Sequence, residues 1–291
     1  MHDIVVIGAG PAGLTAAIYA RRAGKSVLVL EKDTFGGQVT FSPKLENYPG
    51  FESISGNELA QRMLEQAMAL GADIDLDTVT GIENGEIKTV IGESGRYPCR
   101  AVVILPGEER FIGNGISYCA VCDGAFYRGA HVAVVGGGNT ALQEIMLLSE
   151  LCRKVTVVQN LPTLTGEAAI AQAVCEKENV ECLYNTVIAA YEGGETLNAL
   201  LLKNTATEEE LHLNVDGAFL AVGTEPENKP FANVTKLDAA GYICADEHCL
   251  TGTPGVFVAG DCRTKQYRQV ATAVSDGAAA ALSACAFLKD Q

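Results

Sequence analysis

The sequence predicts an α/β fold made of two Rossmann-like nucleotide-binding domains, the second inserted into the first. Three observations predict it. A strand, a glycine-rich turn and a helix open the chain, the same pattern returns near its middle, and a strand ending in Gly-Asp lies near its C-terminus. The chain has 291 residues, of which 48% are hydrophobic. That is enough for one large core or two medium ones.

The first glycine-rich turn, Gly8-Ala9-Gly10-Pro11-Ala12-Gly13, follows an apolar strand over residues 4–7 and precedes an apolar helix pattern. In such a turn the first glycine bends the chain, the second admits a pyrophosphate, and the third lets the helix pack on the strand. A second strand over residues 26–30 ends at Glu31, eighteen positions after Gly13. A carboxylate there can accept from a ribose hydroxyl. This pattern predicts a bound adenine dinucleotide, and a ligand-free turn is the alternative.

The same pattern returns in residues 131–158. A strand over 131–135 precedes the turn GGGNTA at 136–141, a helix over 142–151 and a strand over 155–158. Near the C-terminus, a buried strand ends at Gly260-Asp261 and precedes a helix of small residues over about 269–287. These last elements complete the first domain rather than begin a third. We therefore expect a discontinuous first domain, 1–110 plus 239–291, and an inserted domain, 111–238.

The inserted domain opens with a CxxC motif, Cys119-Ala120-Val121-Cys122, followed by Asp123. Next to βαβ units, such a motif indicates thiol and disulfide exchange. Zinc is the competing use, but it needs further ligands, and the four histidines are scattered. We therefore predict no metal site. The other cysteines are expected to be small buried hydrophobes: Cys99, Cys152, Cys175, Cys182, Cys244, Cys249, Cys262 and Cys285.

Charge and hydropathy exclude several classes of partner. The net charge is −15 and no basic run is present, which disfavours nucleic acid and anionic lipid. The apolar C-terminal stretch over 271–288 is interrupted by Ser275, Asp276 and Gly277, so no membrane span is expected. The N-terminus lacks a basic leader. A cytoplasmic location is the expectation.

Several motifs together carry a family resemblance. GAGPAG with Glu31, FGGQV at 35–39, ENYPG at 46–50, CAVCDG, GGGNTA and AGDCRTKQYRQVATAVSDG at 259–277 follow one another over nearly the whole chain. Together they resemble the low-molecular-weight thioredoxin reductase family. The resemblance implies a homodimeric two-dinucleotide-binding-domain flavoprotein. Such a flavoprotein binds FAD and passes electrons from the flavin to a CxxC disulfide and on to thioredoxin.

The resemblance also implies roles for individual residues. Cys122 matches the sulfur that faces the flavin, Cys119 the thiol that attacks the partner's disulfide, and Asp123 the acid/base that moves the proton. A helix N-cap is the structural alternative for Asp123. The residues expected to bind FAD are Gly8, Gly10, Ala12, Gly13, Glu31 and Lys32 on its ADP side, and Gly37, Gln38, Asn47, Asp261, Arg268, Gln269 and Val270 on its flavin side. The last three bring a helix N-terminus to the flavin ring, where partial positive charge favours the reduced anion.

The segment after the second turn departs from the family pattern. Family members that use NADPH carry a His-Arg-Arg segment and a further Arg there, which bind the 2′-phosphate. This chain has Gln159-Asn160-Leu161 and Thr165, with no basic residue between Lys154 and Lys177. The departure resembles the ferredoxin-dependent flavin thioredoxin reductases. We therefore expect reduced ferredoxin as electron donor, a flavin being able to accept electrons singly and deliver them in pairs.

Two alternatives stay open for the function. In one, NAD(P)H binds through an atypical site in which Gln159 bonds a ribose hydroxyl, or another donor serves. In the other, the protein is a flavin and thiol redox sensor. A proton relay at Asp123 weighs against the sensor. A sensor needs a disulfide that can be oxidised and reduced, but it does not turn over substrate and so needs no proton relay.

Two further features bear on the donor. Ferredoxins are acidic, so a chain at −15 needs a local basic patch to attract one. Candidate cations are Arg21, Arg22, Lys25, Arg263, Lys265 and Arg268. The chain also runs from Leu105 directly into Pro106-Gly107, where the family has a longer loop. This short connection leaves any flavin contacts from that loop unassigned.

Overall fold

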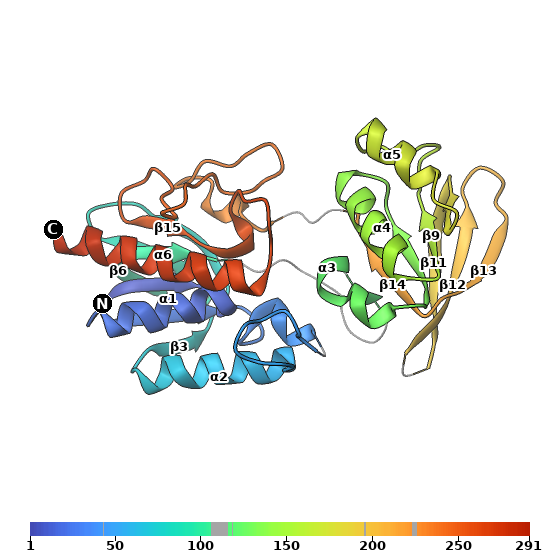
Figure 1. Cartoon of the computed structure of the whole chain (residues 1–291). Helices are drawn as coiled ribbons and strands as arrows, with labels where there is room; N and C mark the ends of the chain where they lie inside the picture. The colour runs from blue at the N-terminus through green and yellow to red at the C-terminus, as the bar shows by residue number, and fades with distance from the viewer. Residues whose placement is uncertain (43, 106–115, 118, 195, 223–225) are drawn as a thin grey trace. The chain divides into compact units, whose positions relative to one another are not determined.

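The computed structural model describes the chain apart from residues 43, 106–115, 118, 195 and 223–225 (Figure 1). Contacts divide the chain into two compact units, residues 1–110 with 225–291 and residues 111–224. Both units are α/β, and parallel strands form the centre of each main sheet. The predicted fold class, two Rossmann-like domains, is confirmed.

The first unit is built on a seven-stranded sheet of order β3-β2-β1-β6-β5-β4, with β15 pairing to β6. The strands β1, β2, β3, β6 and β15 run parallel, while β4 and β5 form an antiparallel extension of β6. The strands are β1 (His2–Ile7), β2 (Val27–Glu31), β3 (Asp73–Leu76), β4 (Val79–Glu83), β5 (Lys88–Gly92), β6 (Arg96–Ile104) and β15 (Val256–Val258). The Gly-Asp strand therefore completes the first sheet, as the sequence indicated.

Alternation along the strands gives this sheet two apolar faces. Ile4 and Val6 pack with the helices, whereas Val5 and Ile7 pack with Phe231 on the opposite face. Coverage of both faces explains the continuous apolar runs of β1 and β2. The helices and 3₁₀ turns are α1 (Pro11–Arg22), η1 (Gly37–Phe41), α2 (Gly56–Ala69), η3 (Lys229–Phe231), η4 (Gly260–Cys262) and α6 (Val270–Lys289).

Helix α6 lies beside α1 (Figure 1). A Cβ on Gly277 would lie 2.1 Å from the carbonyl oxygen of Ala12, so only glycine permits this approach of the two helices. Among the described residues, α6 is the one helix long and apolar enough to cross a membrane. Its alanines pack in the core with α1, and its Asp276 is buried in ion pairs. These features are those of the core helix of a globular unit.

The second unit contains a parallel five-stranded sheet of order β10-β9-β8-β14-β7 and an antiparallel sheet of order β11-β12-β13. Val132 and Val134 face α4, whereas Ala133 faces the antiparallel sheet. The elements are β7 (Ile116–Ser117), α3 (Ala120–Asp123), η2 (Gly124–Tyr127), β8 (His131–Val135), α4 (Asn139–Leu151), β9 (Lys154–Val158), α5 (Ala168–Cys175), β10 (Val180–Leu183), β11 (Thr186–Gly193), β12 (Leu197–Asn204), β13 (Glu210–Asn214) and β14 (Gly217–Leu220).

The second boundary differs from the expected one. Residues 226–238, which we assigned to the inserted domain, belong to the first unit. The reason is packing: Phe231 and Val234 are buried in the core beneath the first sheet, together with Ile82 and Val90. The short connection after Leu105 lies outside the described residues.

Candidate active site

The first glycine-rich turn joins β1 to α1 through contacts that only glycine allows. Gly8 has φ +108°, and a Cβ there would lie 2.1 Å from the carbonyl oxygen of Leu105. A Cβ on Gly13 would lie 1.9 Å from the carbonyl oxygen of Gly8. Gly10 precedes the helix and Pro11 occupies its first turn. The free N–H groups at the start of α1 are therefore available for a phosphate.

The Glu31 carboxylate lies at this turn. One oxygen accepts from the Ala9 N–H at 2.7 Å, and the other accepts from the N–H groups of Lys32 and Asp33 at 2.9 and 3.1 Å. A carboxylate has about four acceptor positions, so three N–H donors leave capacity for one ribose hydroxyl. Glu31 therefore shapes the turn and can still bind a nucleotide.

A cavity of about 520 Å³ adjoins the turn. Gly8, Glu31 and Lys32 line one part of it, and residues from 77–80 and 226–231 line the rest. Lys32 and Glu227, which both line the cavity, form an ion pair at 2.5 Å. The volume is in the range of ligand sites. The cavity and the glycine turn together fit the ADP half of FAD.

The predicted flavin-side residues converge on the same end of the first unit. A Cβ on Gly37 would lie 3.2 Å from the Cα of Gly10, so η1 sits directly against the glycine turn. The Asn47 amide donates to Gln269 Oε1 at 3.2 Å. Gln269 caps α6, which begins at Val270. Segments far apart in sequence therefore meet at the N-terminus of α6.

Arg268 and Asp261 belong to this group as well. The Arg268 guanidinium donates to the backbone carbonyl of Asp261 at 3.2 Å and stacks on the ring of Tyr242, 4.1 Å from its centroid. Ala12 approaches the same turn, because a Cβ on Gly260 would lie 3.2 Å from the Ala12 Cβ. Gln38 lies in η1, next to Gly37.

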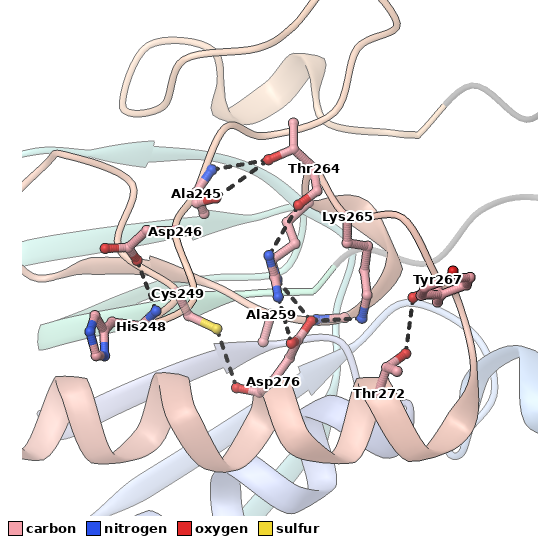
Figure 2. Close-up of polar contacts among 12 residues, drawn as sticks. Ala245, Asp246, His248, Cys249, Ala259, Thr264, Lys265, Tyr267, Thr272 and Asp276 are labelled. Atoms are coloured by element: carbon pink, nitrogen blue, oxygen red, sulfur yellow. Dashed lines mark hydrogen bonds and ion pairs between the residues drawn. The ribbon is translucent and has the colours of Figure 1, made fainter.

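Two of the proposed docking cations are buried. Arg263 donates to both Asp276 oxygens at 2.8 Å, and Lys265 donates to the same carboxylate at 2.9 Å (Figure 2). The Gly260 N–H donates to Asp276 as well, at 3.1 Å. Arg263 and Lys265 therefore hold α6 to the Gly-Asp turn, and our expectation that they form part of a ferredoxin dock is wrong. Burial by itself would raise the pKa of Asp276, but the hydrogen bonds from the two cations lower it below its usual value.

Three of the other docking candidates, Arg21, Arg22 and Lys25, lie at or near the far end of α1, whereas Arg268 stacks on Tyr242. Arg21 and Arg22 end that twelve-residue helix, so at 1.5 Å per residue they lie about 18 Å along its axis from the glycine turn. Arg21 donates to the backbone carbonyls of Leu70 and Lys25.

In the second unit, Cys119 and Cys122 are joined by a disulfide with their Cα atoms 5.3 Å apart. Cys119 stands directly before α3, and its sulfur accepts from the Cys122 N–H at 3.1 Å. Both cysteines are half-buried, and Val121 between them is 65% exposed. The Ala120 N–H donates to the buried carboxylate of Glu144 on α4 at 3.3 Å. The disulfide therefore lies on a helical turn that α4 supports and solvent reaches.

Asp123 is held next to the disulfide by a residue that sequence reasoning missed. The Ser117 hydroxyl is buried and donates to Asp123 Oδ2 at 2.6 Å, and it also accepts from the Cys119 N–H at 3.1 Å. Burial raises the pKa of Asp123 above its usual value, and the hydrogen bond from Ser117 offsets part of that rise. Asp123 makes no capping hydrogen bond, so the N-cap alternative is wrong. The sequence indicated Ser117 only through its position six residues before Asp123.

The second glycine-rich turn has the expected backbone. Gly136 has φ +122°, and a Cβ there would lie 2.5 Å from the carbonyl oxygen of Ala221. The segment after β9 differs from its counterpart in the first unit. Gln159 is 3% exposed, and its amide donates to the carbonyl of Thr163 at 2.9 Å. A Cβ on Gly137 would lie only 2.5 Å from that amide nitrogen.

The chain after Gln159 is bonded to the second turn, as Gly36 is bonded to the first through the Ala9 carbonyl. The Thr165 and Gly166 N–H groups donate to the Gly137 carbonyl at 2.7 and 3.0 Å. The Glu167 N–H donates to the Asn139 side chain at 2.7 Å. The Gln159 side chain is therefore buried and bonded within the protein, next to Gly137 of the second turn.

Cysteine burial agrees with expectation at five positions: Cys99, Cys152, Cys249, Cys262 and Cys285 are buried. Cys175 is exposed, and Cys182 and Cys244 are half-buried. The expectation is therefore wrong for Cys175 and holds only in part for the other two. Within the described residues, no cluster of His, Cys, Asp and Glu could hold a metal ion.

Comparison with known proteins assigns the class to which this fold and site belong. Residues 2–277 match the family described as pyridine nucleotide-disulphide oxidoreductase. The chain belongs to this family, whose thioredoxin reductases bind FAD, and FAD is the cofactor that the first turn and its cavity fit.

Individual relatives narrow the class. The chain is 40% identical to thioredoxin reductase from Bacillus subtilis, covering 97% of this chain and 93% of that protein. It is 39% identical to thioredoxin reductase from Treponema pallidum, covering 99% and 97%. The structure of thioredoxin reductase from Streptococcus pyogenes matches with a TM-score of 0.94 at 35% identity, covering 100% and 99%. The chain is therefore an oxidoreductase of the thioredoxin reductase group, as the motifs indicated.

Proposed function

We propose that the protein reduces thioredoxin through the Cys119–Cys122 disulfide, and that its FAD receives electrons from reduced ferredoxin rather than from NADPH. The observation that carries the donor proposal is the residue types after β9, where residues 155–176 contain no Lys or Arg and the strand is followed by the neutral Gln159, whose buried amide is bonded to Thr163. When bound, FAD supplies a carrier that accepts electrons singly and passes them on in pairs.

The residues of the second unit supply the thiol chemistry. Reduction of the disulfide requires two electrons and leaves thiols or thiolates at Cys119 and Cys122. The Cys119 thiolate then attacks the disulfide of thioredoxin. Asp123 holds the proton that the leaving sulfur takes up, and its raised pKa brings the carboxyl closer to the working pH. Ser117 positions Asp123 and the Cys119 backbone in one arrangement.

One feature of the second turn supports a donor other than NADPH. The stretch from 155 to 176 contains no cation for a 2′-phosphate, and planar guanidinium groups are the usual ligands for it. The segment 159–167 is bonded to the glycine turn and to the start of α4. The first turn has a similar bond, from the Gly36 N–H to the Ala9 carbonyl at 2.9 Å, so the missing cations are the feature that separates the second turn from an NADPH site.

Electrostatics then predicts how the donor associates. The net charge is −15, and Arg263 and Lys265 are held by Asp276. An acidic ferredoxin therefore meets net repulsion, which salt screens. We expect the second-order rate of flavin reduction to rise with ionic strength; a steep fall would show that a basic dock exists.

The test is anaerobic and uses the FAD-loaded protein. Excess NADPH, excess NADH and chemically reduced ferredoxin are each mixed with it while the visible flavin band is followed. We expect bleaching by ferredoxin alone. Rapid bleaching by NADPH would overturn the donor proposal and favour the atypical nucleotide site. The variant Gln159→Ala, which empties the space beside Gly137, should still fail with NADPH because it adds no cation.

Reduction of thioredoxin by the Cys119 thiol is tested separately. Cys119→Ser should still be bleached by the donor but should not reduce thioredoxin, because the attacking sulfur is gone. Full-rate turnover by this variant would contradict the assignment. Bleaching without thioredoxin turnover in the unaltered protein would instead favour the redox sensor.

The resemblance supports two further parts of the proposal, a homodimer and a cytoplasmic location. Sedimentation of the FAD-loaded protein at micromolar concentration should give twice the mass of the 30.6 kDa chain, and a single-chain mass would contradict the dimer.

A further inference from the structure

A second pair of cysteines lies in the second unit, apart from the CxxC disulfide. Cys175 is the last residue of α5, and Cys182 lies on β10, which is an edge strand of the parallel sheet. Four residues connect α5 to β10, and the two elements pack together. The two thiols therefore come from neighbouring elements joined by a short connection.

Tyr184 contacts both cysteines of the pair. Its hydroxyl lies 3.8 Å from the Cys175 sulfur. Tyr184 directly follows the end of β10, and its side chain also contacts Cys182. Cys182 packs against the core cluster that contains Val174, the residue before Cys175. The backbone carbonyl of Tyr184 accepts from Thr186 and Asn204, which fixes the tyrosine in place.

The two thiols differ in access. Cys175 is exposed and Cys182 is half-buried. Burial raises the pKa of Cys182, and its contact with Cys175 raises that pKa further. Burial and the contact with Cys175 raise the pKa of Tyr184, so its hydroxyl keeps its proton and can donate to a Cys175 thiolate. Cys175 is thus the thiol that an oxidant in solution meets, and Cys182 is the buried partner.

We infer that Cys175 and Cys182 are a second redox-active dithiol, a modification site that hydroperoxides convert to a disulfide. The Cys175 thiolate attacks an oxygen of the hydroperoxide, the O–O bond breaks, and Cys175 becomes a sulfenic acid with release of an alcohol, or of water when the oxidant is hydrogen peroxide. Cys182 then displaces the hydroxyl group from that sulfur, forming the S–S bond and releasing water. One peroxide takes up the two electrons that the thiols lose.

The bond would join the end of α5 to the edge of the sheet. Helix α5 begins directly after the segment 159–167, which is hydrogen-bonded to the second glycine turn and to Asn139. Oxidation therefore fixes the helix that follows this segment, outside the CxxC site and without consuming either of its sulfurs.

The sequence allows a direct test by mass spectrometry. The FAD-loaded protein is treated with one equivalent of hydrogen peroxide, its remaining thiols are alkylated, and it is digested with trypsin without reduction. Lys177 lies between the two cysteines, so residues 155–177 and 178–203 leave as separate peptides with one cysteine each. We expect these peptides to be linked, with loss of two hydrogens, and two fewer free thiols per chain.

Matched variants make the result decisive. In Cys182→Ser, Cys175 should stop at the sulfenic acid, which dimedone traps. In Cys244→Ser, which removes the half-buried Cys244, the 155–177/178–203 link should form as before. Recovery of both peptides fully alkylated, or of Cys175 oxidised while Cys182 stays alkylated in the unaltered protein, would overturn the inference. The CxxC peptide serves as internal standard, since it has its own disulfide.

Discussion

In the first unit the glycine-rich turn borders a cavity of about 520 Å³, whereas in the second unit the side chain of Gln159 packs against the corresponding turn. Both turns have a first glycine at positive φ, +108° at Gly8 and +122° at Gly136. In both, a Cβ at that glycine would strike a backbone carbonyl. The first turn has the Glu31 carboxylate at its middle residue, where it accepts from the Ala9 N–H, whereas the second has the neutral Gln159 amide beside Gly137. The difference teaches that the turn motif specifies a backbone, while the residue after the next strand sets the charge beside it.

The largest expected effect comes from breaking the first turn. Gly8→Ala should abolish FAD binding, because its Cβ would lie 2.1 Å from the Leu105 carbonyl oxygen. The ratio of flavin absorbance to protein absorbance measures the loss. Gly24→Ala is the matched control, since φ there is +77° with nothing within 4 Å. It should cost only roughly 1–2 kcal/mol of backbone strain and keep the flavin. Equal flavin content in both variants would contradict the role of the turn.

Asp123→Asn should lower the activity of the protein while raising its thermal stability at pH 7. Loss of a general acid/base is expected to lower thioredoxin turnover by about 10²–10⁴-fold. Burial raises the pKa of Asp123, so the folded chain binds this proton more tightly than the unfolded chain does. That stabilisation is present below the ordinary Asp pKa of 3.8 and is lost as pH rises through the folded-state value.

The variant should therefore melt at a higher temperature than the unaltered protein at pH 7, and the two should converge below about pH 4. Thermal melts across this range provide the check. A lower melting temperature at pH 7 would argue against a buried, costly carboxylate. Ser117→Ala removes a hydrogen bond that lowers the pKa of Asp123, so Asp123 should keep its proton to higher pH and the alkaline fall of the pH–rate profile should move to higher pH.

Asp276→Asn tests what holds the first site together. The change leaves the buried Arg263 and Lys265 without their carboxylate and should cost about 3–5 kcal/mol of unfolding free energy, measured by urea denaturation. The pKa of Asp276 is lowered, so its stabilisation is present above the ordinary value and is lost as pH falls through the folded-state pKa. The gap between variant and unaltered protein should therefore shrink in acid. An unchanged gap would contradict the ion-pair account.

The smallest expected effect comes from changing the second glycine-rich turn. Gly137→Ala should cost about 1–3 kcal/mol of unfolding free energy, because its Cβ would overlap the Gln159 amide at 2.5 Å. In a Gln159→Ala background the same change should cost less, and the double-mutant cycle measures the coupling. An identical cost in both backgrounds would show that Gln159 does not fill the space beside the turn.

Sequence patterns located most of the main α/β framework because those signals are local. The strand before Gly8, the helix after it and the strand ending at Gly260-Asp261 all depend on apolar periodicity and on glycines whose conformation is set within a few residues. The antiparallel sheet β11–β13 and the extension β4–β5 were not predicted. Many of their residues are exposed or half-exposed, as in β4 and β13, so apolar alternation marks these strands weakly even though they pair with near neighbours in the chain, as β5 does with β6. The predicted end of the inserted domain was wrong because the unit to which Phe231 belongs depends on the residues that it packs against in the folded chain.

By itself the sequence determined the two glycine-rich turns, the CxxC pair and the absence of arginines after the second turn, because each is a property of residue type at fixed spacing. Only the tertiary structure decided that Ser117 holds Asp123, that Asp276 buries Arg263 and Lys265, and that Cys175 lies by Tyr184. The physical reason is that burial, hydrogen bonding and access belong to the space around a side chain. That space is built by segments which meet only when the chain has folded.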